Sequence, residues 1–185
     1  MQQDSPTQLS LLSIIFHWSI SVTFICLLCV GIYMADNEIY SLYPIHKSIG
    51  ILILLLVVPR ILWRLKNGFP APLYDNTTQK KLATAAHVLL LIATLLMPIS
   101  GMMMSGFAGH GLAVFGLELA AANPDPLNPG QVIAINSSLA GLGHEVHEIA
   151  KNIIILIILV HIAGALKHHF MDKDGTLRRM LGRKV

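Results

Sequence analysis

The stretch GHEVHEIAKNIIILIILVHIAGALKHH, residues 143–169, determines how the rest of the chain is interpreted. Its apolar run, Ile153 to Val160, has His147 before it and His161 directly after it. On an α-helix these two histidines share a face to within about 40° and lie roughly 21 Å apart along the axis. The pattern predicts one membrane-length helix with an imidazole near each end, which suits two cofactors stacked across a bilayer.

The composition of the 185-residue chain indicates a membrane protein. Apolar residues make up 54% and charged residues 12%, whereas soluble domains carry about 25% charged residues. The basic residues cluster at the ends of apolar runs rather than on a basic-aromatic face, so nucleic-acid binding is not expected. Cys26 and Cys29 lie within the first apolar run and are interpreted as small packing residues.

Four uncharged or weakly charged runs predict an all-α membrane protein with a four-helix transmembrane bundle in a single domain, residues 1–185. The expected helices cover about residues 13–34, 46–65, 82–106 and 145–167. Pro59 and Pro98 are expected to bend the second and third helices. Residues 107–143 are expected to form a periplasmic cap of short interfacial helices, because a proline- and glycine-rich cluster at 123–130 interrupts them.

The distribution of charge predicts the orientation. Eleven of the thirteen Lys and Arg residues lie in or beside the loop after the second helix or in the C-terminal tail, and the exceptions are Lys47 and Lys151. The positive-inside rule therefore places both termini in the cytoplasm. The opposite side combines those two lysines with six acids: Asp36, Glu38, Glu118, Asp125, Glu145 and Glu148.

Five histidines fall at two depths in this topology. His17, His87 and His161 lie one or two turns inside the cytoplasmic interface, and His46 and His147 lie at the periplasmic ends of their helices. Facing helices of a bundle can offer two neutral imidazoles to opposite sides of a haem iron. We expect two haems, one held by His17 and His161 and the other by His46 and His147.

Several of these residues have alternative roles. Any intramembrane histidine can instead hydrogen-bond to a neighbouring helix. His87 can replace His17 as a ligand, protonate a quinone, or join two helices. His144 is interpreted as a surface residue or a neighbour of a haem propionate, with replacement of His147 as ligand as the alternative. Arg60 and Arg64 are either interfacial anchors or partners of haem propionates or a quinone headgroup.

The chain resembles the bacterial cytochrome b561 family, which consists of four-helix dihaem membrane cytochromes and includes superoxide oxidase. The resemblance covers nearly the whole chain in order. It is carried by His17-Trp18, Ile45-His46, the run Arg60 to Lys66, Ala86-His87 with Pro98 eleven residues later, His147-Glu148 with His161, the run Ala165 to Phe170, and the run Asp174 to Met180.

The resemblance implies a multi-pass protein of the bacterial inner membrane that passes electrons between the periplasmic face and a membrane quinone, ubiquinone or another. It implies His17, His46, His147 and His161 as axial ligands, and Trp18, His87 and His168 as candidates at the quinone. Superoxide oxidase oxidises superoxide to dioxygen while ubiquinone is reduced. On this interpretation the chain is a superoxide:ubiquinone oxidoreductase.

The charge of the periplasmic side departs from that pattern. Superoxide oxidase attracts its anionic substrate with a basic periplasmic surface, whereas six acids face two lysines here. Lys47 beside His46, with Lys151 one turn past His147, would still give a local positive charge, with long-range steering absent or reversed. The alternative is therefore a cytochrome b subunit that serves a partner dehydrogenase or a soluble periplasmic redox donor. A third hypothesis is a histidine-lined metal or proton transporter.

Overall fold

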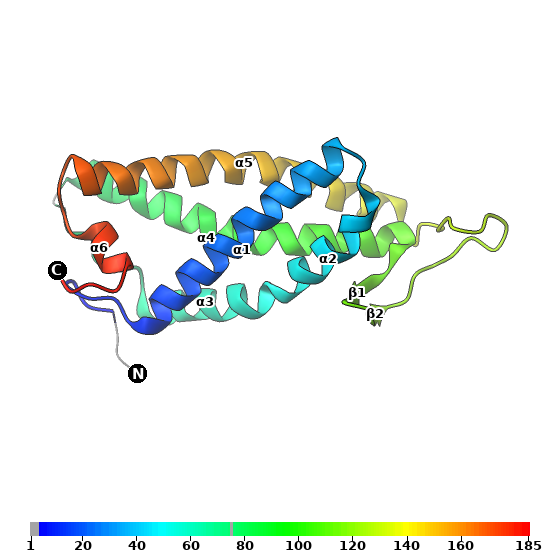
Figure 1. The fold of residues 1–185 in the computed structure, drawn as a ribbon, viewed down its shortest axis with the longest axis horizontal. Helices are drawn as coiled ribbons and strands as arrows, with labels where there is room; N and C mark the ends of the chain where they lie inside the picture. The colour runs from blue at the N-terminus through cyan, green and yellow to red at the C-terminus, as the bar shows by residue number, and fades with distance from the viewer. Residues whose placement is uncertain (1–3, 75) are drawn as a thin grey trace. The chain divides into compact units, whose positions relative to one another are not determined.

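The structure is a computed structural model that describes residues 4–74 and 76–185. In this part of the chain four segments are long and apolar enough to cross a membrane: Leu11–Asp36, Tyr40–Asn67, Thr77–His110 and Ser137–Phe170. The prediction of four membrane-spanning helices is therefore confirmed. The elements are α1 (Leu11–Asp36), the 3-10 helix η1 (Tyr40–Leu42), α2 (Tyr43–Leu52), α3 (Leu54–Asn67), α4 (Thr77–Ser105), the π-helical turn η2 (Gly106–His110), β1 (Leu112–Val114), β2 (Leu117–Ala120), α5 (Ser137–Phe170) and α6 (Thr176–Met180). Figure 1 labels the α-helices and the two strands.

Polar residues cap the first turns of three long helices. The Oγ of Ser10 accepts a hydrogen bond from the Ser13 amide at the start of α1. The Oδ1 atoms of Asn76 and Asn136 do the same for Gln79 and Leu139, both at 3.0 Å. Because such caps satisfy the free amides of a first turn, α4 and α5 begin at Thr77 and Ser137, before the starts expected at 82 and 145.

The second span is interrupted at Ile53, which separates α2 from α3. Pro59 itself lies inside α3, as Pro98 lies inside α4. A proline lacks an amide hydrogen and crowds the carbonyl four residues earlier, so the influence of Pro59 reaches back to Leu55, close to the interruption.

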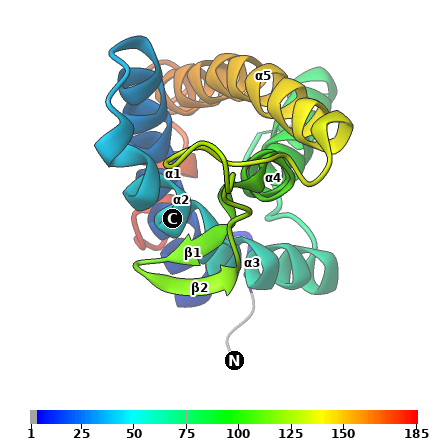
Figure 2. The ribbon, with the colours of Figure 1, turned by 90° about the vertical axis from the view of Figure 1, so that its right-hand side faces the viewer.

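The segment after η2 is not the series of short helices that we expected. Leu112–Val114 and Leu117–Ala120 pair as an antiparallel hairpin (Figure 2). Phe115 and Gly116, the two residues between the strands, have φ angles of 47° and 89°. Two successive positive φ angles are typical of the tight turn that matches the twist of a hairpin. The prediction of helices here was wrong because this turn contains Phe-Gly rather than the usual Asn-Gly or Asp-Gly signal.

The chain divides into two compact units, each containing parts of all four spans. Unit 1 consists of Met1–Ser21, Leu56–Ala93 and Ile153–Val185, described from Asp4 onward and without residue 75. Unit 2 consists of Val22–Leu55 and Thr94–Asn152. In unit 1 the core includes the fully buried Val57 and Ile154, and in unit 2 it includes Ile53 and Phe24.

The outer surface of the spans is apolar. Leu55 is 70% exposed and Leu156 is 63% exposed, as expected for helices solvated by lipid. Within unit 1 the two ends of the chain meet, because the Thr7 carbonyl accepts a hydrogen bond from the Val185 amide at 3.0 Å. An even number of spans requires both ends to lie on one side of the membrane. That this side is the cytoplasm stays a prediction from the charge distribution.

Candidate functional site

In unit 2, His46 and His147 line one cavity of about 280 Å³. His46 belongs to α2 and His147 to α5. The remaining lining is mostly apolar and includes Phe24, Leu28 and Met97. A largely apolar cavity with two convergent imidazoles is a candidate binding site for a large flat cofactor.

Two glycines make room for these imidazoles. A Cβ atom added to Gly31 would lie 3.1 Å from Cε1 of His46, and one added to Gly101 would lie 3.2 Å from Cε1 of His147. Both distances are tighter than an ordinary van der Waals contact. Small residues let neighbouring transmembrane helices approach closely, and here they also leave space for a ring on the facing helix.

The Nδ1 atom of His147 is held by α4. It lies 3.0 Å from the main-chain carbonyl oxygen of Met97 and 3.1 Å from the Oγ of Ser100. A carbonyl oxygen only accepts hydrogen bonds, so this contact favours a proton on Nδ1. Nε2 then keeps its lone pair, which is the state that a metal ligand requires.

His46 has no equivalent hydrogen bond. Its Nδ1 atom is buried, and within residues 4–74 and 76–185 it has no hydrogen-bond partner. A buried polar atom without a partner is costly, and a bound group that brings an acceptor would remove that cost. Nδ1 of this ring is therefore available to a bound group.

Unit 1 brings the other three predicted histidines together. The ring centroid of His161 lies 6.2 Å from that of His17 and 5.3 Å from that of His87. His87 meets His161 edge to face and stacks on Phe69. The predicted cluster of His17, His87 and His161 is thus present, and both candidate partners of His161 are adjacent to it.

Arg60 and Arg64 have different partners. The guanidinium of Arg60 lies 3.4 Å from Nδ1 of His17, which leaves its charge beside the histidine cluster. Arg64 forms an ion pair with Asp4 at 2.7 Å and donates to the Oγ of Ser13 at 2.8 Å. In this structure Arg64 therefore holds the N-terminal segment, and Arg60 is the arginine that faces the cluster.

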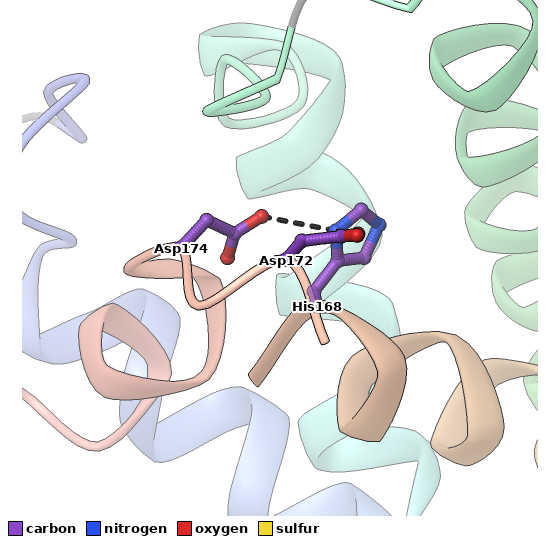
Figure 3. Close-up of side chains that lie close together, drawn as sticks. All are labelled: His168, Asp172 and Asp174. Carbon is purple, nitrogen blue, oxygen red and sulfur yellow. Dashed lines mark ion pairs between the residues drawn. The ribbon is translucent and has the colours of Figure 1, made fainter. Parts of the chain in front are cut away.

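Trp18 and His168 also belong to unit 1. The indole N–H of Trp18 donates to the Met180 carbonyl oxygen at 2.9 Å, and its ring packs edge to face against His17. His168 stacks on Tyr74, and its Nδ1 atom faces Asp172 and Asp174 (Figure 3). Trp18 thus supports His17, and its N–H is already engaged.

Lys47, Lys151 and His144 line the cavity of unit 2 together with the two histidines. Lys151 is paired with Glu148 at 2.6 Å. Lys47 instead donates to the neutral hydroxyl of Ser105 at 3.1 Å. His144 is exposed at the edge of this cavity, one turn before His147. The charge of Lys47 is therefore less compensated than that of Lys151.

Comparison with known proteins decides the family. Residues 8–183 match the family described as prokaryotic cytochrome b561. The chain belongs to the prokaryotic cytochrome b561 family. It is 32% identical to cytochrome b561 homolog 2 of Escherichia coli K12 over 187 aligned positions, which cover 97% of this chain and 94% of the relative. It is 29% identical to a probable superoxide oxidase, CybB, of Yersinia pestis, with 95% and 96% covered.

Membership establishes the general role of this cytochrome. Proteins of the family are electron-transfer proteins that bind b-type haem, and the four apolar helices make this chain a multi-pass protein of the bacterial inner membrane. A third relative, cytochrome b562 of Cereibacter sphaeroides, is 30% identical over 137 positions, or 74% of this chain and 66% of the relative.

The histidines of this cytochrome suit b-type haem. In unit 2 two imidazoles line a mostly apolar cavity. His147 holds its Nδ1 against the Met97 carbonyl and keeps the lone pair of Nε2, and Nδ1 of His46 is buried without a hydrogen-bond partner in the described part of the chain. In unit 1 the spacing is informative, because two imidazoles on opposite sides of one metal atom, with bonds of about 2 Å, have ring centroids about 6 Å apart. The His17–His161 separation of 6.2 Å agrees with this value, and the His87–His161 separation is shorter.

The sequence did not reveal the residues that support these histidines in the cytochrome. Gly31, Gly101 and Ser100 were not singled out as parts of a site, and neither were Asp172 and Asp174. The glycines carry a weak signal, since each is an isolated small residue within an apolar span. The Met97 carbonyl carries no sequence signal, because any residue at that position would provide a main-chain carbonyl.

Proposed function

We propose that this cytochrome holds two b-type haems and transfers electrons from superoxide, at the periplasmic face, to a membrane quinone. In this proposal His46 and His147 would hold one haem in unit 2, and His17 and His161 would hold the other in unit 1. The observation that carries it is His147, whose Nδ1 is committed to the Met97 carbonyl while its ring shares a cavity with His46. When bound, a haem iron with two imidazole ligands supplies reversible one-electron transfer.

The overall reaction balances with two superoxide anions for each quinone. Each anion loses one electron and becomes dioxygen, and the quinone gains both electrons and two protons to form a quinol. The protons require donors at the quinone, for which His87 and His168 are the candidates because imidazole exchanges protons near neutral pH.

Charged side chains would help to bind a small anion in unit 2 and a haem propionate or a quinone in unit 1. Lys47 lines the cavity of unit 2. Its hydrogen-bond partner is the neutral hydroxyl of Ser105, which leaves its positive charge in place. It would attract a small anion locally. Arg60, beside His17, would hold a haem propionate or a quinone oxygen. Trp18 would act by packing against His17, because its N–H already bonds to Met180.

Superoxide as the donor is supported by the relative from Yersinia pestis, which is described as a probable superoxide oxidase. The test is rapid mixing of the oxidised, haem-loaded protein with superoxide in the absence and presence of ubiquinone. We expect haem reduction faster than spontaneous dismutation, followed by reoxidation with one quinol formed for every two superoxide anions consumed. Haem that stays oxidised, or that is reduced without quinol formation, would contradict this function.

A second candidate is an electron-transfer subunit for a basic redox partner. The six acids predicted on the periplasmic side all belong to unit 2, and Glu118 and Glu145 are exposed. An acidic surface attracts a positively charged partner and repels superoxide over long range. Co-purification of a stable redox complex from native membranes, together with slow reduction by superoxide, would favour this function over the first.

A further inference from the structure

A compact group of ligand atoms lies at the end of α5. The Nδ1 atom of His168 and one carboxylate oxygen each from Asp172 and Asp174 lie within 4.8 Å of one another (Figure 3). His168 is in the last turn of α5, and the two aspartates belong to the connection between α5 and α6. The three side chains converge from two sides of a turn within unit 1.

The distances in this cluster fit a shared metal ion as well as they fit a hydrogen bond. Nδ1 of His168 lies 3.0 Å from Oδ2 of Asp172 and 2.9 Å from Oδ2 of Asp174. A ring nitrogen carries at most one proton and can donate to only one of them. Yet Nδ1 of His168 and Oδ2 of Asp174 are both buried without an aligned hydrogen bond in the described part of the chain. Neighbouring ligands of one ion, with bonds of about 2.1 Å, lie about 3.0–3.4 Å apart.

Each ligand is held in place by a further contact. The His168 ring stacks on Tyr74, with centroids 4.4 Å apart and an angle of 12° between the planes. The other oxygen of Asp174 accepts a hydrogen bond from the Thr176 amide at 2.8 Å. Asp172 pairs with Lys167 at 2.6 Å through Oδ2, the oxygen that also faces His168, so an ion would share or replace this contact. The site is therefore rigid before any ion binds, which lowers the entropic cost of binding.

The exposure of the cluster gives a dissolved cation access to it. The His168 and Asp174 side chains are 13% and 14% exposed, whereas Asp172 is 35% exposed and opens the cluster to solvent. The two carboxylates have two cationic neighbours, because Lys167 pairs with Asp172 and the charge of Arg179 acts on Asp174. An imidazole nitrogen with two carboxylate oxygens suits Zn²⁺ and similar transition metals better than Mg²⁺ or Ca²⁺.

We propose that His168, Asp172 and Asp174 bind one divalent transition-metal ion of the Zn²⁺ class, with solvent completing its coordination. The ion would connect the C-terminal turn of α5 to the start of α6. It is separate from the haem ligands proposed above, and its binding does not require electron transfer.

The test is zinc binding to the full-length, haem-loaded protein without a polyhistidine tag. Zinc chloride is titrated in chelator-free buffer, and bound zinc is measured by equilibrium dialysis with elemental analysis. The variants are His168→Ala and Asp174→Asn, and His169→Ala is the matched control because this histidine lies outside the cluster. We expect one saturable zinc ion per chain in the parent and in His169→Ala, with affinity at least about tenfold weaker in both cluster variants.

Two results would overturn the proposal. One is a parent protein that shows no saturable zinc binding. The other is equal affinity in the parent, His168→Ala and Asp174→Asn, which would assign the zinc to adventitious sites. An unchanged haem spectrum confirms that each variant is folded. If a variant fails this check, Asp172→Asn, at the most exposed ligand, is measured in its place and must show the same loss.

Discussion

The Nδ1 atom of His147 lies 3.0 Å from the carbonyl oxygen of Met97, so a side chain of α5 is oriented by the main chain of α4. Ser100 donates to the same carbonyl at 2.9 Å and lies 3.1 Å from the same nitrogen. The ring is therefore fixed by groups one turn or less apart on the facing helix. Its other nitrogen is left for a ligand.

The glycine that faces His147 provides the first prediction. In Gly101→Ala the new Cβ would lie 3.2 Å from Cε1 and 3.4 Å from Nδ1 of His147. We expect the ring to shift, at a cost of about 1–3 kcal/mol, and the haem-to-protein ratio to fall. The control is Gly141→Ala, because a Cβ at Gly141 meets nothing within 4 Å. Equal haem retention in the two variants would show that the close approach at Gly101 has no role in haem binding.

The pairing of Asp4 with Arg64 predicts a pH-dependent stability. Burial by itself would raise the pKa of Asp4, but hydrogen bonds from Ser10, Arg64 and Ser13 outweigh it and hold the pKa below 3.8. A lowered pKa in the folded state stabilises the protein above the pKa of the unfolded state, about 3.9, and this contribution disappears as the pH falls through the folded-state value.

Asp4→Asn should therefore be less stable than the parent at neutral pH, by roughly 1–3 kcal/mol. The thermal unfolding midpoint in detergent measures this effect. We expect the difference between parent and variant to narrow only below about pH 4. Asp36→Asn, at an exposed acid, should unfold like the parent. A difference in unfolding midpoint between Asp4→Asn and the parent that persists unchanged well below about pH 4 would mean that the carboxylate charge contributes nothing.

Two lysines of the same cavity form a matched pair for testing superoxide attraction. Lys47 hydrogen-bonds to the neutral Ser105, whereas Lys151 is paired with Glu148. We expect Lys47→Gln to slow haem reduction by superoxide roughly twofold to fivefold and to weaken its dependence on salt. Lys151→Gln should have a smaller effect. Equal rates for Lys47→Gln and the parent would remove Lys47 from the proposed site.

His87 can be tested by separating haem binding from quinone reduction. The ring centroids of His87 and His161 lie 5.3 Å apart, which is closer than the separation of about 6 Å expected for two imidazole ligands of one iron. We therefore expect His87→Ala to keep the haem content of the parent while the transfer of electrons to quinone slows. Loss of one haem in this variant would instead make His87 an axial ligand in place of His17.

The main features of the fold could be predicted from the sequence because they depend on strong, regular signals. Long apolar runs gave the four spans, and the positions of His17, His87 and His161 on three of them predicted a shared depth. In the structure their rings lie close together in unit 1. Helix starts were less well predicted. Asn76 and Asn136 extend α4 and α5 into polar sequence, where hydropathy gives no signal.

The hairpin at Leu112–Ala120 and the support of the site could not be predicted in the same way. The hairpin depends on positive φ angles at Phe115 and Gly116, and phenylalanine rarely adopts this conformation. The contact between His147 and Met97 depends on how α4 and α5 face each other, which a periodic pattern does not specify. The ion pair of Arg64 with Asp4 joins residues sixty positions apart.

The haem-to-protein ratio of the parent, His147→Ala and His161→Ala tests the central claim most directly, with His169→Ala as the control. The purified proteins are compared by pyridine haemochrome analysis and by their reduced-minus-oxidised spectra. We predict two haems per chain in the parent and the control, and about one in each of the two variants, because one axial ligand of one haem has been removed. A parent without bound haem, or an unchanged content of two haems in either variant, would contradict the ligand assignment on which the proposed function depends.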